Sequence, residues 1–174
     1  MALKILSPDI IHKTEVGGVL LGLNSAEEVA QGADTMLGRV RSECPTANIT
    51  RVLVQPMVPR GHELLLGMIR DPQFGPVVMV GFGGIYVEVL KDTVTRLAPL
   101  SRGEALEMLD ELRMAPLLRG VRGQPPVDRS ALAEIICRFA QLAMDVAELR
   151  EIELNPLVAS PSGVVAVDAR GAGE

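Results

Sequence analysis

The sequence predicts an α+β or mixed α/β fold in which helices flank an antiparallel sheet. Three β-rich runs separated by short turns predict a meander, because tight turns join antiparallel neighbours. A later stretch with apolar residues at helical spacing predicts a long helix that packs on the sheet. The meander covers residues 51–58, 62–71 and 76–80 with an extended continuation over 85–90, and the long helix covers 128–149.

The segments on either side of the meander complete this pattern. A strand over 2–6 opens the chain, a loop rich in Pro, Gly and charge follows over 7–18, and a second strand covers 19–23. Ser25 and Glu28 have the spacing of a capping box, which predicts a helix from there to about Glu43. After Asp92 the chain is expected to turn helical, and the predicted pieces cover 101–113 and 115–119 before a linker at 120–126.

Composition excludes several classes of protein. A hydrophobic content of 48% over 174 residues predicts a folded globule, as one domain or two small subdomains. Aromatic residues make up 2% with no Trp, which argues against base stacking, and a net charge of −5 argues against a general nucleic-acid binder. No apolar run is long enough to span a bilayer, and no signal peptide is evident, so neither nucleic acid nor a membrane is an expected partner.

Cysteine usage indicates a reducing compartment. Cys44 and Cys137 are far apart and have no neighbouring His, which fits neither a zinc site nor a disulfide framework. We therefore expect a cytoplasmic protein.

The segment 150–170 contains the polar pattern best suited to a metal. It predicts two strands joined by a Ser-Pro-Ser-Gly turn, and side chains alternate between the faces of a strand. Glu151, Glu153 and Asn155 therefore share one face, and the returning strand brings Asp168 toward them. Carboxylate and amide oxygens suit Mg²⁺. The pattern alone leaves open a surface hairpin whose polar residues only face water.

The loop at 7–18 contains the residues best suited to phosphate. His12 precedes Lys13 and lies five residues before Gly17 and Gly18, and a neutral imidazole there is a competent phosphoryl acceptor. Backbone N–H groups of a glycine-bearing loop bind phosphate oxygens, and Lys4 in the preceding strand supplies a charge. The alternatives are a plain surface histidine and a lysine that snorkels at a sheet edge.

Two familiar nucleotide motifs do not apply. The glycines at 81–84 are followed by Tyr86 and a strand, unlike the dinucleotide fingerprint, and no Walker A lysine motif is found. Gln55 and Glu63 bracket the turn at 56–61, where a nucleotide would take adenine hydrogen bonds from the backbone and ribose contacts from a carboxylate. Exposed Gln and Glu on a meander are the simpler explanation of these two residues.

Taken together, these pieces resemble the ATP-grasp domain (β-subunit type) of ADP-forming acyl-CoA and acetyl-CoA synthetases, in the succinyl-CoA synthetase superfamily. The resembling segments run in order over nearly the whole chain, which makes the match specific. They are ALKILSPDIIHKTEVGGV (2–19), VLVQPMV (52–58), GHELLLG (61–67), DPQFGPVVMVGFGGIYVEVLKD (71–92), RLAPL (96–100), EIELNPLV (151–158) and AVDA (166–169).

The resemblance implies a role for each candidate residue. On the nucleotide side, the implied phosphate contacts are Lys4, Gly17 and Gly18. The implied adenine contacts are Gln55 to Val58, and the implied ribose contact is Glu63. His12 matches the histidine that the family phosphorylates. On the metal side, Asn155 and Asp168 hold Mg²⁺, and Glu153 supports the metal or the phosphohistidine.

The resemblance also implies an organisation and an activity. Residues 1–50 would form part of the first ATP-grasp lobe, which in the family begins with a further helix and strand, and residues 51–174 the second lobe with the adenine hinge and the metal-binding hairpin. The implied activity is Mg-dependent phosphoryl transfer between ATP or ADP and a histidine. The implied partners are CoA-binding and ligase domains or an α subunit, through which acyl-CoA and phosphate enter.

Two alternatives remain beside this enzyme. One is a non-catalytic regulatory module of a protein lysine acetyltransferase, for which loss of the histidine is the expected mark. The other is a chain that only folds or forms a homo-oligomer. The presence of Lys4, His12, Asn155 and Asp168 favours the enzyme.

Overall fold

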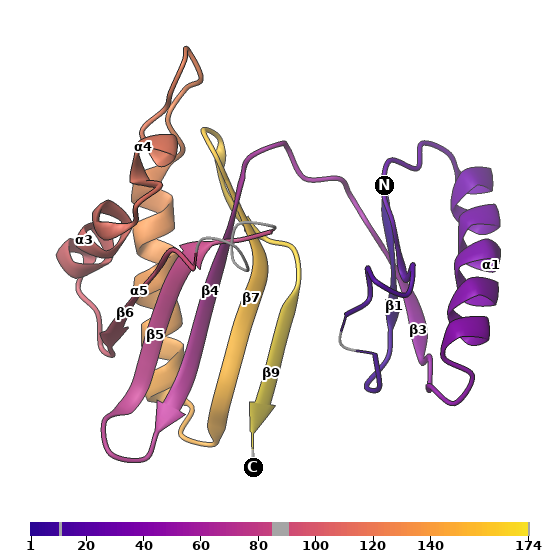
Figure 1. Cartoon of the computed structure of the whole chain (residues 1–174), viewed down its shortest axis with the longest axis horizontal. Coiled ribbons are helices and arrows are strands. Elements are labelled where there is room, and N and C mark those ends of the chain that lie inside the picture. Colours follow the sequence, from indigo (N-terminus) through magenta and orange to yellow (C-terminus); the bar gives the residue numbers. More distant parts are fainter. Residues whose placement is uncertain (11, 85–90, 174) are drawn as a thin grey trace. The chain divides into compact units, whose positions relative to one another are not determined.

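The chain divides into two compact units. The computed structural model describes residues 1–10, 12–84 and 91–173. The N-terminal unit is Met1–Met57 and the C-terminal unit is Val58–Glu174 (Figure 1). The domain boundary expected after residue 50 lies later, because β3 (Arg51–Gln55) pairs along its length with β1 (Ala2–Leu6) and so belongs to the first unit.

The N-terminal unit is a three-stranded antiparallel sheet with one helix. In its described residues the strand order is β2-β1-β3, with β2 at Val19–Leu20, and the helix α1 covers Ala26–Glu43. Leu3 and Ile5 of the central strand are fully buried and pack with Met36 and Val40 of α1. These four side chains form the centre of a small core between the sheet and α1.

The start of α1 is capped as expected, with one difference. The Ser25 hydroxyl accepts the Glu28 N–H at 3.1 Å, as the spacing predicts. The Glu28 carboxylate accepts the N–H of Asn24 at 2.7 Å instead of that of Ser25. The two carboxylates of the first turn, Glu27 and Glu28, also interact favourably with the positive, N-terminal end of the helix dipole.

The C-terminal unit is built on a six-stranded antiparallel sheet. In the described residues the order is β6-β5-β4-β7-β8, and β9 also pairs with β7. The strands are β4 (His62–Asp71), β5 (Gly75–Phe82), β6 (Thr93–Leu97), β7 (Leu149–Ser160), β8 (Gly163–Ala166) and β9 (Ala169–Gly173).

Three details of this sheet differ from the sequence prediction. The meander is β4-β5-β6, without residues 51–58, and a strand lies at Thr93–Leu97 where the chain was expected to turn helical. The returning strand of the hairpin is divided into β8 and β9. The extended continuation expected over 85–90 falls outside the described residues.

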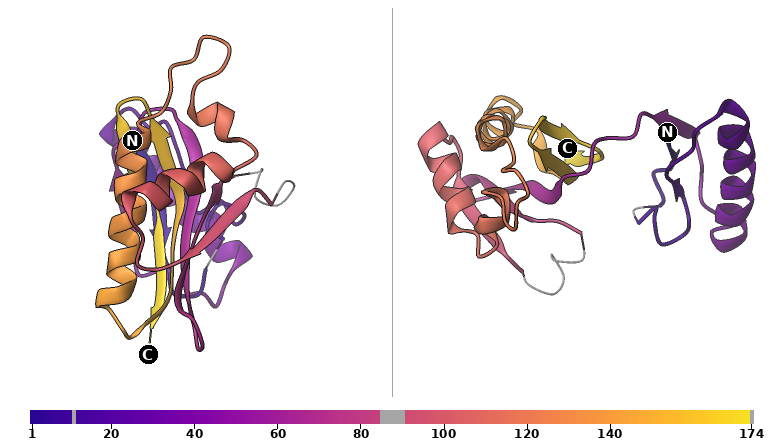
Figure 2. Two further views of the ribbon diagram at one scale, coloured as in Figure 1. Left: turned by 90° about the vertical axis from the view of Figure 1, so that its left-hand side faces the viewer. Right: turned by 90° about the horizontal axis from the view of Figure 1, so that it is seen from above.

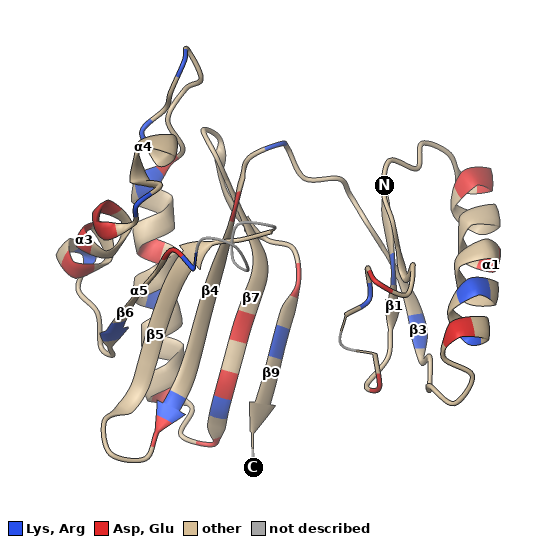
Figure 3. Cartoon of the chain, viewed as in Figure 1, with Lys and Arg blue, Asp and Glu red and all other residues tan. Residues whose placement is uncertain are grey.

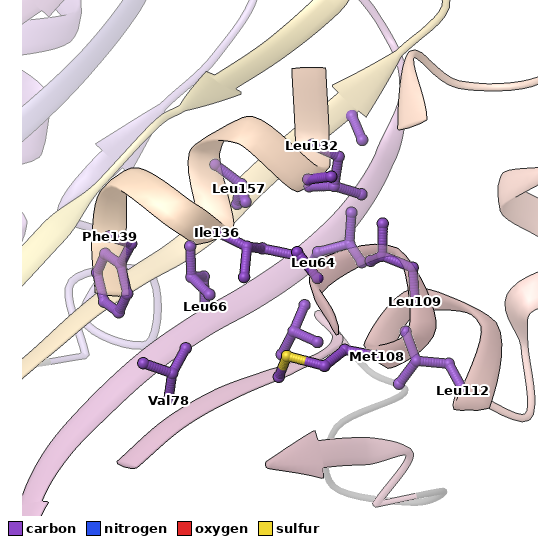
Figure 4. Close-up of a cluster of buried hydrophobic side chains, with 14 of the residues drawn as sticks. Leu64, Leu66, Val78, Met108, Leu109, Leu112, Leu132, Ile136, Phe139 and Leu157 are labelled. Atoms are coloured by element: carbon purple, nitrogen blue, oxygen red, sulfur yellow. The ribbon is translucent and has the colours of Figure 1, made fainter. Parts of the chain in front are cut away.

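Helices cover one face of the sheet. They are α3 (Arg102–Glu111), α4 (Ala115–Leu118) and α5 (Arg129–Asp145), and they lie in front of the sheet in the left view of Figure 2. Leu64 and Leu66 of β4 meet Leu132, Ile136 and Phe139 of α5 in the core between the two layers (Figure 4). Within the described residues, no helix is long and apolar enough to cross a membrane.

Arg70 fixes the end of α5 to the sheet. Its guanidinium donates to the carbonyl oxygens of Ala143 at 2.6 Å, Val146 at 2.9 Å and Leu149 at 3.0 Å. These carbonyls belong to the last turn of α5 and the start of β7, where helix acceptors lack intrahelical partners. The helix therefore ends at Asp145, short of the predicted 149.

Asp92 joins the meander to the helical layer. The side chain is only 5% exposed, and its two oxygens accept the N–H groups of Arg113 at 2.8 Å and Met114 at 2.9 Å. The two backbone N–H groups satisfy the oxygens of the buried carboxylate, and the carboxylate satisfies the backbone donors of the turn between α3 and α4.

We expect Asp92→Ala to destabilise the C-terminal unit by about 2–4 kcal/mol, because two buried N–H groups lose their acceptor. Urea unfolding followed by circular dichroism measures this loss. Asp145→Ala, at an exposed carboxylate bonded to Gln141, is the matched control and should change stability by less than about 0.5 kcal/mol. Equal effects of the two substitutions would contradict the role given to Asp92.

Candidate active site

Lys4 lies in the central strand of the N-terminal sheet. It is opposite Val19 of β2 and Leu53 of β3, and it is 7% exposed. Because its neighbours Leu3 and Ile5 face α1, Lys4 projects from the other face of the sheet, the side on which the 7–18 loop lies (Figure 1). A central position rules out the alternative of a lysine that snorkels at a sheet edge.

The 7–18 loop is held at both ends. On its first side Ile10 is buried in the core, and the Asp9 carboxylate accepts the N–H of Asn48 at 2.7 Å. On its second side the Gly18 N–H donates to the Lys13 carbonyl at 2.7 Å, and the Gly18 carbonyl accepts from Ile5 at 2.9 Å. The loop is therefore anchored at its two ends to the core and to the first strand.

His12 lies in the middle of this loop and faces solvent. Its side chain is 75% exposed, and Nδ1 is 4.0 Å from Oε1 of Glu15. An accessible imidazole beside a carboxylate has the access and the electrostatic support that a phosphoryl acceptor needs. Glu15 was not singled out from the sequence; its spacing of three residues from His12 across a turn is the signal that could have found it.

Each glycine of the loop has its own local reason, a positive φ at Gly17 and close contacts at Gly18. Gly17 has φ +68°, and a Cβ there would lie 2.7 Å from Nε of Arg39 on α1. A Cβ on Gly18 would lie 2.7 Å from Cδ1 of Ile5 and 2.9 Å from the Lys13 carbonyl oxygen. Arg39 is a second residue that sequence reasoning missed, because its contact with the loop depends on how α1 packs.

Asn155 and Asp168 meet at a bulge in the C-terminal sheet. Leu64 and Leu66 of β4 are opposite Leu157 and Leu154 of β7, so β7 has one extra residue at Asn155–Pro156. The Asn155 N–H donates to the Asp168 carbonyl at 3.2 Å, which places the two residues side by side on adjacent strands. The backbones of Asn155 and Asp168 are therefore adjacent, and the convergence of their side chains on a metal stays a prediction.

Glu153 orients the amide of Asn155. Its Oε1 accepts from Nδ2 of Asn155 at 2.8 Å, which directs the amide nitrogen toward Glu153 and leaves Oδ1, the atom that binds cations, on the other side. In the described part of the chain, no group of three or more His, Cys, Asp and Glu side chains could hold a metal by itself. Asn155 and Asp168 could therefore supply two oxygen ligands to Mg²⁺, which takes its others from waters and phosphates.

The predicted adenine hinge spans the boundary between the two units. Gln55 is the last residue of β3 and pairs with Ala2, whereas Val58 is the first residue of the C-terminal unit. Glu63 lies on β4 opposite Val158, and its carbonyl accepts the Gly83 N–H at 2.7 Å. Glu63 is exposed at the end of β4 that also carries the bulge.

The candidate residues thus form one group in each unit. The N-terminal unit carries Lys4, His12, Gly17, Gly18 and Gln55, whereas Val58, Glu63, Glu153, Asn155 and Asp168 belong to the C-terminal unit. Figure 3 shows acidic residues along β7 and just before β9.

Comparison with known proteins defines the class. A family model described as an ATP-grasp domain matches residues 1–171. The β subunit of acetate–CoA ligase [ADP-forming] I from Pyrococcus furiosus is 45% identical over 170 residues, which cover 98% of this chain and 73% of that subunit. Acetate–CoA ligase [ADP-forming] I from Archaeoglobus fulgidus is also 45% identical, and there the chain spans 25% of the relative.

A solved structure agrees in fold and sequence. Acetyl-coenzyme A synthetase 1 from Ca. Korarchaeum cryptofilum, described as dinucleotide forming and in complex with coenzyme A and Ca-AMPCP, superposes with a TM-score of 0.96 at 42% identity. The match covers 99% of this chain and 76% of that one. The chain therefore belongs to the ATP-grasp family. Within it, its homologues are the nucleotide-binding β subunits and domains of ADP-forming acyl-CoA ligases, as the sequence resemblance indicates.

The close contacts at Gly18 generate a stability prediction within the N-terminal unit. Gly18→Ala should cost about 1–3 kcal/mol, because the added Cβ overlaps Ile5 and the Lys13 carbonyl. Gly38→Ala is the matched control on α1, where a Cβ meets nothing within 4 Å, and it should stabilise by about 0.5–1 kcal/mol. Thermal unfolding of both variants checks the opposite signs; a neutral Gly18→Ala would contradict the packing.

Proposed function

We propose that this chain is the nucleotide-binding part of an ADP-forming acyl-CoA synthetase and transfers a phosphoryl group between ATP or ADP and His12. The observation that carries the proposal is the exposed His12 imidazole in a closed, glycine-bearing turn over the sheet that contains buried Lys4. The high identity with ADP-forming acetate–CoA ligases supports it. We further propose acetate as the carboxylate and the cytoplasm as the location.

The overall reaction is acyl-CoA + ADP + phosphate ⇌ carboxylate + ATP + CoA. In the direction of ATP use, an imidazole nitrogen of His12 attacks the γ-phosphorus, an N–P bond forms, the bond to the β-phosphate oxygen breaks and ADP leaves. Oε1 of Glu15 lies 4.0 Å from Nδ1, and we propose the other ring nitrogen, Nε2, as the one that attacks. In the direction of ATP synthesis the same bonds form and break in reverse.

The remaining residues position and neutralise the reactants. Lys4 supplies positive charge to the phosphates. The N–H groups of Gly17 and Gly18 donate to the carbonyls of Thr14 and Lys13, so the two glycines close the loop on the phosphate side of the site. The hinge from Gln55 to Val58 binds adenine through backbone groups, and Glu63 binds the ribose hydroxyls. Phosphoryl transfer needs positioning and charge neutralisation more than covalent chemistry, so these roles suffice for the step assigned here.

The proposed metal ligands complete the site. Mg²⁺ held here would supply positive charge that offsets the charge of the phosphates. Asn155 and Asp168 are the proposed ligands, and Glu153 holds the Asn155 amide in the orientation that presents its oxygen. The bulge at Asn155–Pro156 keeps both ligands at the same place on the sheet.

A partner must supply the rest of the reaction. The chain spans 73% of the separate Pyrococcus furiosus β subunit and a quarter of the longer Archaeoglobus fulgidus chain. We propose that CoA-binding and ligase domains, on an α subunit or on the same polypeptide, bind acyl-CoA and phosphate and exchange the phosphoryl group with His12. The regulatory module of a lysine acetyltransferase is not favoured, because the candidate residues are present and the homologues are ligases.

The phosphoryl acceptor can be tested directly. Incubation of the chain and its partner with γ-labelled Mg·ATP should give an acid-labile, base-stable phosphate on the wild type and none on His12→Ala. The substitution removes only the nucleophile, since the exposed side chain contributes little to folding. His62→Ala, the other histidine of the chain, is the control and should label like the wild type. Equal labelling of His12→Ala would exclude this role.

The metal ligands give a second test. Asn155→Ala or Asp168→Ala should weaken Mg·ADP binding about 10-fold or more in calorimetry, because each removes an oxygen ligand of the shared cation. Added EDTA should weaken the wild type similarly and should change the two variants much less. Absence of heat from the wild type at millimolar Mg·ADP would indicate a chain that only folds or oligomerises.

A further inference from the structure

The face of the C-terminal sheet that the helices leave uncovered contains a cavity. Its volume is about 240 Å³, and its lining includes Gly67, Met79, Thr95, Glu151, Glu153 and Arg170. These residues come from β4, β5, β6, β7 and β9, and they alternate along their strands with residues that pack on the helices, such as Leu66 and Val78. The cavity therefore lies on the same face of the sheet as Glu153, next to the proposed metal ligands Asn155 and Asp168.

Gly67 keeps the floor of this cavity open. It lies opposite both Met79 of β5 and Glu153 of β7. A Cβ there would make only ordinary contacts, 3.7 Å from Cε of Met79 and 3.9 Å from the Ile152 carbonyl oxygen. Packing would tolerate a side chain at this position, and a glycine inside a central strand lowers its stability. Because it has no side chain, the glycine leaves space above the sheet.

Arg170 is the cation in the described lining of the cavity. It is directly opposite Glu153 in the β7–β9 ladder and two residues after Asp168. Within the described residues its side chain makes no hydrogen bond or ion pair, although Glu151 and Glu153 line the same cavity. A guanidinium that is placed between carboxylates and not bonded to them is available to a ligand.

The charges of this region indicate what the ligand is. Glu151, Glu153 and Asp168 alone would repel a polyphosphate, and a metal at Asn155 and Asp168 offsets only part of their charge. Successive residues on one face of a strand are roughly 6.5–7 Å apart, so the Arg170 side chain reaches a phosphate that shares a metal with Asp168. Its planar donors suit two oxygens of a phosphate.

We infer that Arg170 binds the terminal phosphate of the nucleotide and that the cavity over Gly67 accommodates it. This inference rests on the proposed function, because it presumes a nucleotide whose metal is held at Asn155 and Asp168. Arg170 is then a charge-neutralising residue on the C-terminal unit. Its contribution increases with the number of phosphates, so it discriminates ATP from AMP.

Calorimetric titration of the full chain with Mg·ATP, Mg·ADP and AMP tests this role. Arg170→Gln should weaken Mg·ATP about 10-fold to 100-fold, Mg·ADP less, and AMP by less than about 2-fold. Gly67→Val should also weaken Mg·ATP and spare AMP, because its side chain fills the cavity. Thermal unfolding should show that both variants remain folded.

Two control variants separate the charge of Arg170 from a general effect on the sheet. Glu151→Gln removes a carboxylate from the same cavity and should bind Mg·ATP at least as tightly as the wild type. Arg138→Gln removes an arginine that is 78% exposed on α5 and paired with Glu134, and it should bind like the wild type.

Three outcomes would overturn the inference. Arg170→Gln could bind Mg·ATP like the wild type, or it could lose AMP as strongly as ATP; either result would leave the proposed function standing. A wild-type chain that binds none of the three nucleotides would overturn the inference and the proposed function together.

Discussion

The C-terminal unit depends on a single irregularity, the extra residue that β7 accommodates at Asn155–Pro156. A proline has no N–H to donate, so the ladder with β4 cannot continue regularly through this point. The shift of one residue changes which face the following side chains occupy, and it lets Leu157 and Ala159 enter the core after Glu153 has faced outward. The break between β8 and β9 lies directly beside it, where Val167 donates to the Pro156 carbonyl. The core and the acidic end of the site are therefore set by the same local geometry.

Much of this arrangement could be predicted from local patterns. The alternation after Arg150 predicted the shared face of Glu151 and Glu153, and the Ser-Pro-Ser-Gly segment predicted the turn that pairs Ser160 with Gly163. The apolar stripe expected on α5 includes the buried Leu132, Ile136, Phe139 and Ala143, whereas Leu142 and Val146 of that stripe are exposed. Ser25 predicted the start of α1. These features depend on residues close together in the sequence, where period and turn chemistry carry most of the information.

The features that sequence reasoning missed depend on partners far along the chain. Residues 51–55 were assigned to the meander because they follow the same pattern as its strands, and only pairing with β1 places them in the other unit. The strand at Thr93–Leu97 exists because it lies along β5. Arg70 ends α5 through carbonyls more than seventy residues away, and the contact of Arg39 with Gly17 requires α1 to be packed. The roles of the site residues came from family resemblance and remain predictions.

The division into two units has a consequence for how the chain responds to heat and to ligands. The N-terminal unit contains 57 residues, and its described core has five buried apolar side chains, so its intrinsic stability is small. The C-terminal unit has a much larger core and should melt at a higher temperature. Two transitions are therefore expected instead of one, and a ligand that binds the folded N-terminal unit would raise the lower one by mass action. The transition temperature that a given nucleotide raises would then show which of the two units binds it.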